Sequence, residues 1–262
     1  MWSYQHTGFT VHQLPVLRDN YIYLIESHTS KVLIAVDPAE AVSVRQACKQ
    51  LSKPLTHIFN THHHWDHTDG NLSLKKTFGC QIVGAACDTE RIPGIDIRVS
   101  EIAPPTIPGL HVAVLAVPGH TSGHIAYVVD DALFCGDTLF GGGCGRLFEG
   151  TAGQMWQSLS KIATLDGHVK MYCAHEYTLA NLAFAASVDA DNRVLAERIV
   201  ADKALRQQGF PTIPSTLDSE KNTNPFLRPL NREFCHNYAA AHGVQNEAGV
   251  IFADIRRRKD HF

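Results

Sequence analysis

Apolar residues cluster between polar turns along the first two thirds of the chain, and this pattern predicts strands alternating with helices. Strand-type runs rich in Val, Ile, Leu, Tyr and Phe end at Gly, Pro, Asn or Asp residues. The predicted strands are 11–16, 21–26, 32–37, 56–60, 81–85, 112–117, 125–129, 132–135 and 169–173. Helical spacing predicts helices over 41–51, 71–78 and 155–165, and the proline-rich stretch 91–108 is predicted to be irregular.

The composition changes after about residue 177. Residues 179–208 are rich in Ala, Leu, Arg, Glu and Gln, which favour helix, and the polar cluster 189–192 predicts a break in it. Further short helices or turns are predicted at 233–242 and 248–258. The sequence therefore predicts an α/β domain over residues 1–176 and a mostly helical domain over 177–262.

Composition narrows the possible partners. Of the 262 residues 44% are hydrophobic, which is typical of a globular protein, and the net charge of −3 gives no electrostatic reason to bind nucleic acid or an anionic membrane. No apolar run approaches the length of a membrane span, and the N-terminus lacks the pattern of a signal peptide. The seven scattered cysteines favour reduced thiols, so we expect a cytoplasmic protein. We also expect a monomer.

The most informative stretch is the histidine-rich segment that follows the predicted strand 56–60. His62, His64, Asp66 and His67 offer imidazole nitrogens and a carboxylate, the ligands that suit zinc, iron or manganese. In an extended segment His62 and His64 lie on one side and His63 on the other, and a turn then brings in Asp66 and His67. The spacing therefore predicts two pairs of ligands, one for each of two adjacent metals.

Three later strand ends each add one residue of the same kind. His120, Asp137 and His175 follow the predicted strands 112–117, 132–135 and 169–173. A single histidine at a strand end is usually structural, but three such residues at the ends of three strands are what one metal site requires. The seven candidates divide naturally into two sets of three and one carboxylate that both metals can share.

These motifs together resemble the metallo-β-lactamase superfamily and, within it, the glyoxalase II (hydroxyacylglutathione hydrolase) family. The segments that carry the resemblance are His62-x-His64-x-Asp66-His67, Pro118-Gly119-His120-Thr121, Gly136-Asp137-Thr138 and Ala174-His175-Glu176-Tyr177. The glycine loop 143–150 and the basic tail 256–260 carry the narrower assignment. The resemblance implies an αββα sandwich followed by a small, mostly helical C-terminal domain.

The resemblance also implies a set of ligands. His62, His64 and His120 would bind one divalent metal ion, Asp66, His67 and His175 a second, and Asp137 would bridge the two together with a water or hydroxide. Zinc is the expected metal, with iron and manganese as alternatives. Asp66 and Asp137 would contribute to catalysis through the metal-bound hydroxide, which would attack the thioester of S-(2-hydroxyacyl)glutathione, such as S-D-lactoylglutathione, in the detoxification of methylglyoxal.

The residues predicted to recognise the substrate are far apart in the sequence. The resemblance places Arg146, Phe148, Tyr177, Arg256 and Lys259 at glutathione-binding positions, although some family members have tyrosine where this chain has Phe148. On charge alone the basic tail is equally typical of a solvated helix end. Cys144 is interpreted as a packing residue of the loop, because a metal-activated water makes a thiol nucleophile unnecessary.

Three other functions remain open on the sequence. Another hydrolase of the same fold, acting on lactones, β-lactams or phosphodiesters, would share the metal ligands. An iron dioxygenase acting on glutathione persulfide would need only His62, His120 and Asp137. A non-catalytic metal protein is the weakest alternative, since a closed structural zinc site needs four ligands.

Overall fold

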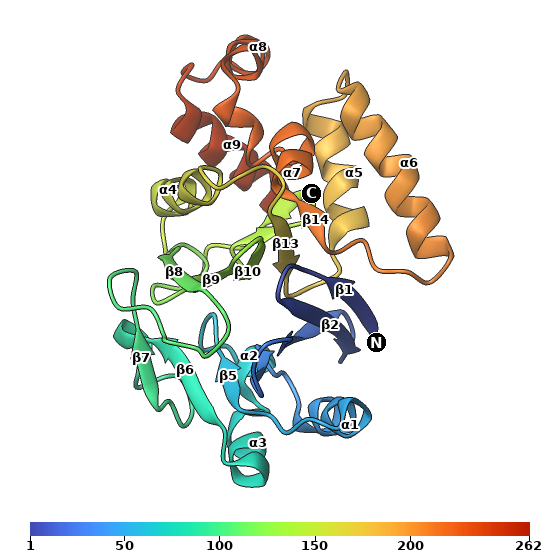
Figure 1. Ribbon diagram of the computed structural model, residues 1–262. Coiled ribbons are helices and arrows are strands. Elements are labelled where there is room, and N and C mark those ends of the chain that lie inside the picture. The colour runs from blue at the N-terminus through green and yellow to red at the C-terminus, as the bar shows by residue number, and fades with distance from the viewer. The chain divides into compact units, whose positions relative to one another are not determined.

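The computed structural model describes the whole chain, residues 1–262. It folds into two compact units, each of which takes two stretches of the chain. The first unit comprises Met1–Ala116 and Gly123–Gly136, and the second comprises Val117–Ser122 and Asp137–Phe262. Figure 1 follows the chain from the strands of the first unit, in blue and green, to the helices at the C-terminus, in orange and red. None of the helices combines the length and apolarity that a membrane span requires.

A seven-stranded sheet forms most of the first unit, with its strands in chain order. The first four strands pair antiparallel, and β4 to β7 pair parallel. The strands are β1 (Trp2–Gln5), β2 (Phe9–Val16), β3 (Asn20–Ser27), β4 (Leu33–Val36), β5 (His57–Phe59), β6 (Gln81–Ala85) and β7 (Ile97–Val99). Because β4, β5 and β6 are parallel, their carboxyl ends lie at the same edge of the sheet.

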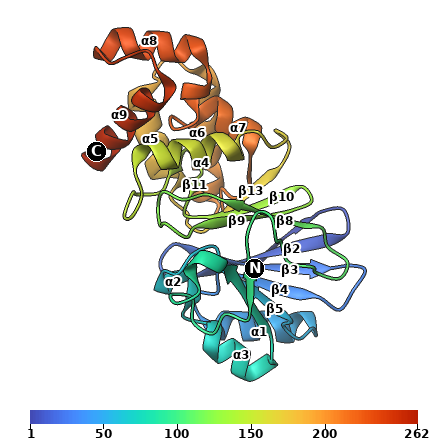
Figure 2. The ribbon, with the colours of Figure 1, turned by 90° about the vertical axis from the view of Figure 1, so that its left-hand side faces the viewer.

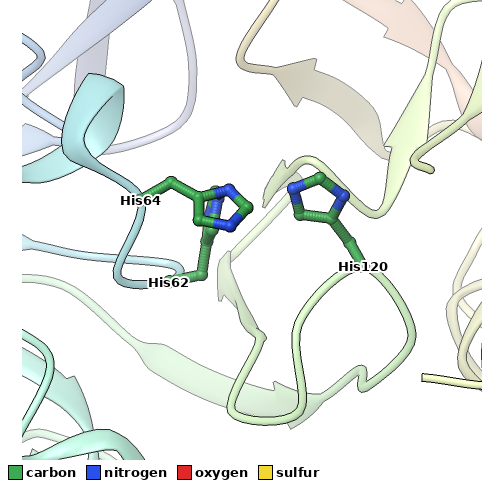
Figure 3. Close-up of side chains that lie close together, drawn as sticks. All are labelled: His62, His64 and His120. Atoms are coloured by element: carbon green, nitrogen blue, oxygen red, sulfur yellow. The ribbon is translucent and has the colours of Figure 1, made fainter. Parts of the chain in front are cut away.

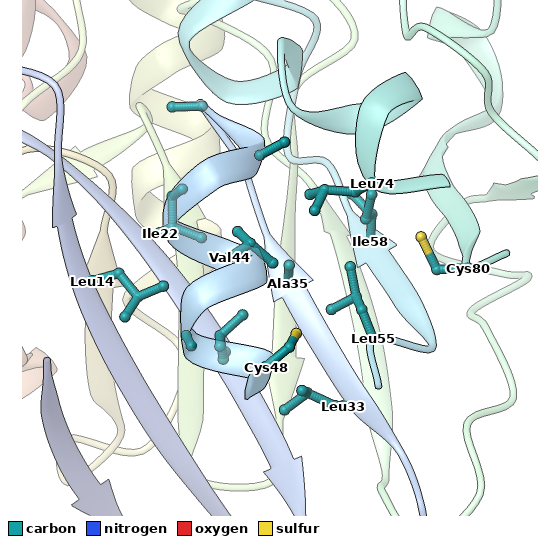
Figure 4. Packing of buried hydrophobic residues seen from close by; sticks show 14 of the residues in the cluster. Leu14, Ile22, Leu33, Ala35, Val44, Cys48, Leu55, Ile58, Leu74 and Cys80 are labelled. Atoms are coloured by element: carbon teal, nitrogen blue, oxygen red, sulfur yellow. The ribbon is translucent and has the colours of Figure 1, made fainter. Parts of the chain in front are cut away.

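Helices cover one face of this sheet. The crossover from β4 to β5 is α1 (Ala41–Leu51), and the crossover from β5 to β6 contains α2 (Trp65–Thr68) and α3 (Asn71–Phe78). Figure 4 shows the core between α1 and the sheet, where Val44 and Leu33 are fully buried. Burial of such aliphatic side chains contributes about 1.5–3 kcal/mol each. A 3-10 turn, η1 (Ala86–Asp88), follows β6.

Three antiparallel strands cover the other face of the sheet: β8 (Val112–Ala116), β9 (Ile125–Val129) and β10 (Ala132–Gly136). Figure 2 shows α1 and α3 on one side of the large sheet and β8 and β9 on the other. Tyr127 stacks on Phe59 with ring centroids 4.4 Å apart. Its buried hydroxyl donates to the carbonyl of Asn60 at 3.1 Å. This contact joins the smaller sheet to the end of β5, where the histidine motif begins.

The second unit is mostly helical. Its strands are β11 (Leu139–Phe140) and β12 (Gly143–Cys144), which form a hairpin, and β13 (Lys170–Cys173), which pairs with β14 (Ser215–Thr216). Its helices are α4 (Ala152–Ile162), α5 (Thr178–Val188), α6 (Arg193–Gln207), α7 (Leu217–Thr223), η2 (Arg228–Leu230), α8 (Arg232–His242) and α9 (Ala248–Asp260).

Most predicted elements are confirmed, and the errors have local causes. The bounds predicted for α1, α3, β6 and β9 are those observed. The predicted helix 155–165 begins earlier, at Ala152, because Thr151 and Gln154 form a capping box at its start. The stretch 91–108, predicted to be irregular, contains the three-residue edge strand β7. Short strands such as β1, β11 and β12 have too few residues for a clear apolar pattern.

Candidate metal centre

In the first unit, the histidine motif leaves the end of β5 and enters α2. The side-chain amide of Asn60 donates to the carbonyl of His67 at 2.9 Å, and the amide N–H of Ile125 donates to the carbonyl of Thr61 at 2.9 Å. Asn60 and Thr61 are fully buried. These bonds fix both ends of the turn, so the histidines between them project from a rigid backbone.

The rings of the motif lie as the alternation predicted. His62 Nε2 is 3.0 Å from His64 Nδ1, whereas His63 turns to Asp88, with Nδ1 3.2 Å from Oδ2. His67 Nε2 lies 3.8 Å from Asp66 Oδ2. His62 and His67 are fully buried, while His64 and Asp66 are partly exposed. The four predicted ligands of this unit therefore come together, and His63 does not join them.

Asp37 is a member of this cluster that the sequence analysis missed. Its carboxylate accepts hydrogen bonds from the Thr61 backbone at 2.8 Å, the Thr61 hydroxyl at 2.6 Å and His67 Nδ1 at 3.0 Å. Because a carboxylate can only accept, the proton of His67 lies on Nδ1, and the Nε2 lone pair can bind a metal. The one sign of this role in the sequence was an aspartate at the end of a strand. In the structure that strand, β4, pairs in parallel with β5.

Backbone geometry at Asp37 also points to a special role. Its φ of 49° lies in the left-handed region, which costs most residues about 1–2 kcal/mol but which Asn and Asp adopt more readily. Asp37, His62 and His67 form a group whose ligand-type atoms lie within 4.8 Å of one another. Through its bond to Nδ1, the carboxylate of Asp37 also orients the ring of His67.

In the second unit, Asp137 lies between two histidines. Its Oδ2 is 3.4 Å from His120 Nε2, and its Oδ1 is 3.4 Å from His175 Nε2. All three residues are buried. One carboxylate oxygen therefore faces each imidazole, which is the arrangement that a carboxylate shared by two metals requires. Figure 3 shows His62 and His64 on the segment after β5, and His120 on the segment after β8.

The loops that carry these residues depend on close backbone packing. His120 Nδ1 donates to the carbonyl of Arg146 at 2.8 Å, which leaves Nε2 free of a proton. A Cβ atom at Gly145 would lie 2.0 Å from the carbonyl oxygen of Asp137, so only glycine fits there. The ring of His175 stacks on Tyr177, with centroids 4.8 Å apart and planes 4° from parallel.

The donor sets in both units fit a divalent cation. His67 and His120 each have Nδ1 committed to an oxygen acceptor and Nε2 directed to a carboxylate, which is the usual state of a metal-binding histidine. Imidazole and carboxylate together suit zinc, iron and manganese. The cluster of His and Asp side chains is therefore a divalent-metal-binding site by its chemistry.

The predicted substrate residues of the second unit divide by exposure. Phe148 is 62% exposed and Tyr177 38% exposed, and their rings contact His120 and His175 respectively. Arg146 is also exposed. Two solvent-exposed aromatic rings therefore lie directly beside two buried imidazoles.

The basic tail lies on α9, and its two predicted binding residues differ. Arg256 is buried: its guanidinium donates to the Cys144 carbonyl at 3.1 Å and to Asp260 at 2.8 Å. Lys259 is half-buried, with Nζ 5.1 Å and 5.2 Å from the ring centroids of Phe184 and Phe262. Burial, with help from the positive charge of Arg256, lowers the pKa of Lys259 below its usual value. A nearby anion would oppose this shift, because it favours the charged form of the lysine.

Cys144 behaves as the packing residue that the sequence analysis expected. It is buried, with Sγ 3.6 Å from the Arg256 guanidinium. Burial raises the pKa of its thiol to about 11, so the thiol is protonated near neutral pH. It therefore offers no thiolate nucleophile.

Family comparisons cover nearly the whole chain. Residues 16–90 and 87–175 match the metallo-beta-lactamase superfamily, and residues 176–262 match the hydroxyacylglutathione hydrolase C-terminus. The chain is 49% identical to the hydroxyacylglutathione hydrolase of Methylococcus capsulatus, over 95% of this chain and 97% of that protein. It is 46% identical to the enzyme of the same name from Rhodospirillum rubrum, over 96% of this chain and 98% of that protein.

Solved structures support the fold. The ETHE1 structure from Myxococcus xanthus has a TM-score of 0.64 at 25% identity, covering 95% of this chain and 97% of that one. A metallo-beta-lactamase from Staphylococcus aureus has a TM-score of 0.66 at 20% identity, covering 97% of this chain and 72% of that one. The expected metallo-β-lactamase fold with a helical C-terminal domain is confirmed.

Proposed function

Because the chain belongs to the hydroxyacylglutathione hydrolase family of the metallo-beta-lactamase superfamily, we propose that it hydrolyses S-(2-hydroxyacyl)glutathione. Water adds its oxygen to the acyl carbon, the carbon–sulfur bond breaks, and a 2-hydroxy acid and glutathione leave. S-D-lactoylglutathione is the substrate we expect, which assigns the enzyme to methylglyoxal detoxification. The observation that carries this proposal is similarity of 46–49% identity over at least 95% of the chain, including the C-terminal part.

The fold and its His and Asp side chains bind a divalent metal. In this proposal the chain would hold two divalent ions, with zinc as the expected metal, and Asp137 would be a ligand of both. Support comes from the 3.4 Å distances from its two carboxylate oxygens to His120 and His175. When bound, the ions would lower the pKa of a water and polarise the acyl carbonyl. One ion would be held by His62, His64 and His120, the side chains drawn in Figure 3, and the other by Asp66, His67 and His175.

The residues of the chain itself have separate roles in this reaction. Asp66 and Asp137 would act as ligands that set the charge of the site. Because a thiolate is a good leaving group, no side chain is needed to protonate the sulfur. The reaction then depends mainly on holding the thioester in place, which is the task of the predicted substrate residues.

We assign glutathione recognition to the helical domain, residues 177–262, and to the glycine loop 143–150. Glutathione carries two carboxylates, and Arg146 and Lys259 provide accessible cations. Arg256 is buried behind them and would add positive charge, while Tyr177 and Phe148 would provide apolar walls. The metal-binding α/β domain would then be residues 1–176.

Two further features of the proposal concern the state of the protein. We expect a cytoplasmic enzyme, because all seven cysteines are free thiols and six of them are buried. We also expect a monomer. The persulfide dioxygenase and the other hydrolases are not favoured, because full-length relatives at 46–49% identity are hydroxyacylglutathione hydrolases.

The direct test is thioester hydrolysis by the purified protein. S-D-lactoylglutathione, acetyl-CoA and a lactone are supplied at equal concentration, and released thiol or acid is measured. We expect S-D-lactoylglutathione to be preferred by roughly a hundredfold or more, because buried and charged recognition groups discriminate strongly. A chelator should abolish the activity, and added zinc should restore it. A sample with two metals per chain and no thioesterase activity would overturn the proposal.

A further inference from the structure

A fully buried carboxylate in the second unit is engaged by four donors. Glu220 of α7 has no exposed surface. Its Oε1 accepts from the Arg198 guanidinium and from the Ser215 hydroxyl, both at 2.6 Å. Its Oε2 accepts from the backbone N–H of Gly142 at 2.9 Å and from the Asn224 amide at 3.0 Å. One oxygen therefore faces the helical domain, and the other faces the β11–β12 hairpin.

The residues of the β11–β12 hairpin do little to fix its own conformation. Its turn contains three consecutive glycines, and Gly142 has a φ of 64° in the left-handed region. Side chains from two helices hold it instead. Asn224, next to Glu220 in the network, also donates to the carbonyls of Phe140 at 3.1 Å and Gly143 at 2.9 Å. The Asn181 amide donates to the carbonyl of Gly141 at 3.1 Å.

The far end of the hairpin reaches residues that the proposed reaction uses. The carbonyl of Cys144 accepts from Arg256 at 3.1 Å. The carbonyl of Arg146 accepts from His120 Nδ1 at 2.8 Å. A shift of the hairpin would therefore move the Arg146 side chain, the partner of Arg256 and the group that orients His120.

We propose that Glu220 is a positioning residue for substrate binding: its Oε2, through Gly142 and Asn224, holds the hairpin that presents Arg146 and braces Arg256. This inference rests on the proposed function, which assigns glutathione binding to those two arginines. Burial of a charged pair gives little net stability on average, because desolvation offsets the attraction. The Glu220 carboxylate matters instead for its direction, because one oxygen bonds Arg198 and Ser215 while the other bonds the hairpin and Asn224.

Glu220→Gln tests the hairpin side of this network. An amide has one oxygen, and the charged Arg198 is the stronger donor, so the amide oxygen should face Arg198 and Ser215. The amide nitrogen would then face the N–H groups of Gly142 and Asn224, and the hairpin would lose its acceptor. Asp202→Asn is the matched control, because Asp202 contacts the same guanidinium, Arg198 Nε to Oδ2 at 3.2 Å, and belongs to α6 rather than to the hairpin contacts.

Two measurements on the metal-loaded enzyme distinguish positioning from folding. In Glu220→Gln, amide hydrogen exchange in peptides spanning 139–146 should be at least about tenfold faster, and KM for S-D-lactoylglutathione should rise about tenfold, the effect of one charged hydrogen bond. The change in kcat should stay below about threefold. Asp202→Asn should leave both exchange and KM near the wild-type values, at a temperature equally far below its own Tm.

Each outcome decides the inference. Equal exchange rates and equal KM values in the two variants would show that Glu220 only stabilises the fold. If Glu220→Gln does not fold, Asn224→Ala replaces it, since that change removes the donors to Phe140 and Gly143 without adding a charge beside Glu220 and leaves the Glu220–Arg198 pair in place. A wild-type protein without thioesterase activity would instead overturn the proposed function, and the exchange comparison would still report whether Glu220 holds the hairpin.

Discussion

The two units orient their histidines by different kinds of acceptor. In the first, His67 Nδ1 faces the side-chain carboxylate of Asp37 at 3.0 Å. In the second, His120 Nδ1 faces the backbone carbonyl of Arg146 at 2.8 Å. Both arrangements place the proton on Nδ1 and prepare Nε2 for a metal. A carboxylate can be removed by one substitution and adds negative charge, whereas a backbone acceptor depends on the conformation of its loop.

This difference follows from how the two sets of ligands are spread along the chain. The first set comes from a single segment that runs from β5 into α2, so local bonds from Asn60 and Thr61 hold it. The second set comes from segments far apart in sequence and lies beside a glycine-rich hairpin. The first unit therefore positions its ligands by side chains near the motif, and the second by packing of distant loops. Three substitutions and one pH dependence test this contrast.

The largest effect is expected at Asp137, where the second set is concentrated. Asp137→Ala removes the carboxylate that faces both His120 and His175, while the bonds of Asp37 to His67 stay intact. We expect turnover to fall on the order of a thousandfold, since a metal contributes several kcal/mol to such a transition state. Metal content per chain and kcat for S-D-lactoylglutathione are measured together. Asp191→Ala, at an exposed aspartate of the second unit, is the control and should keep full activity. Unchanged turnover in Asp137→Ala would refute the bridging role.

A smaller effect is expected at Asp37. Asp37→Asn suits the left-handed backbone better than alanine would, so the backbone is kept. With the amide oxygen kept on the Thr61 backbone N–H, the amide N–H₂ would face both donors that now share Oδ2, Thr61 Oγ1 and His67 Nδ1. His67 would then favour the tautomer with its proton on Nε2, which cannot bind a metal. We expect metal affinity, measured by competition with a chelator, to fall about 10–100-fold.

Arg146→Ala is the counterpart of Asp37→Asn in the second unit. It removes the side chain but keeps the carbonyl that accepts from His120. Metal affinity should therefore stay within about threefold of wild type, while KM rises through loss of a cation for the substrate. A loss of metal as large as in Asp37→Asn would show that the hairpin does not hold its conformation without the Arg146 side chain, and the contrast between the units would fail.

The same contrast explains what the sequence could predict. The alternation of residues 62–64 and the strand before them sufficed to place His62 and His64 together and His63 apart, because the geometry is local. Asp37 was missed because its role depends on the parallel pairing of β4 with β5, and strand order cannot be read from apolar periodicity. Its position at a strand end was the same signal that identified Asp137.

The helical domain shows more clearly what the sequence could not predict. The family resemblance placed both Arg256 and Lys259 at glutathione-binding positions, yet Arg256 is buried against Cys144 and Asp260 while Lys259 is half-exposed. Which face of α9 is covered depends on the hairpin and on Phe226, whose ring centroid lies 5.0 Å from the Arg256 guanidinium. The network of Glu220 was also invisible in the sequence, because its partners come from four separate segments.

The smallest expected effect is a pH dependence of KM, and it arises from Lys259 of the second unit. Burial lowers the pKa of Lys259 from the usual value near 10.4, so its charge is lost at a lower pH than for an exposed lysine. As pH rises through that lowered pKa, the cation for the substrate carboxylate disappears. KM for S-D-lactoylglutathione should therefore rise severalfold on the alkaline side, while kcat, which depends on the metal ligands, changes less.

Lys259→Arg provides the control for this pH dependence, because a guanidinium stays charged throughout the range. Its baseline KM can differ, but KM should stay flat where that of the wild type rises. Ionisation of the substrate itself affects both proteins equally and so cancels in the comparison. An identical alkaline rise in both proteins would remove Lys259 as its cause, and substrate binding would then have to depend on Arg146 and Arg256 alone.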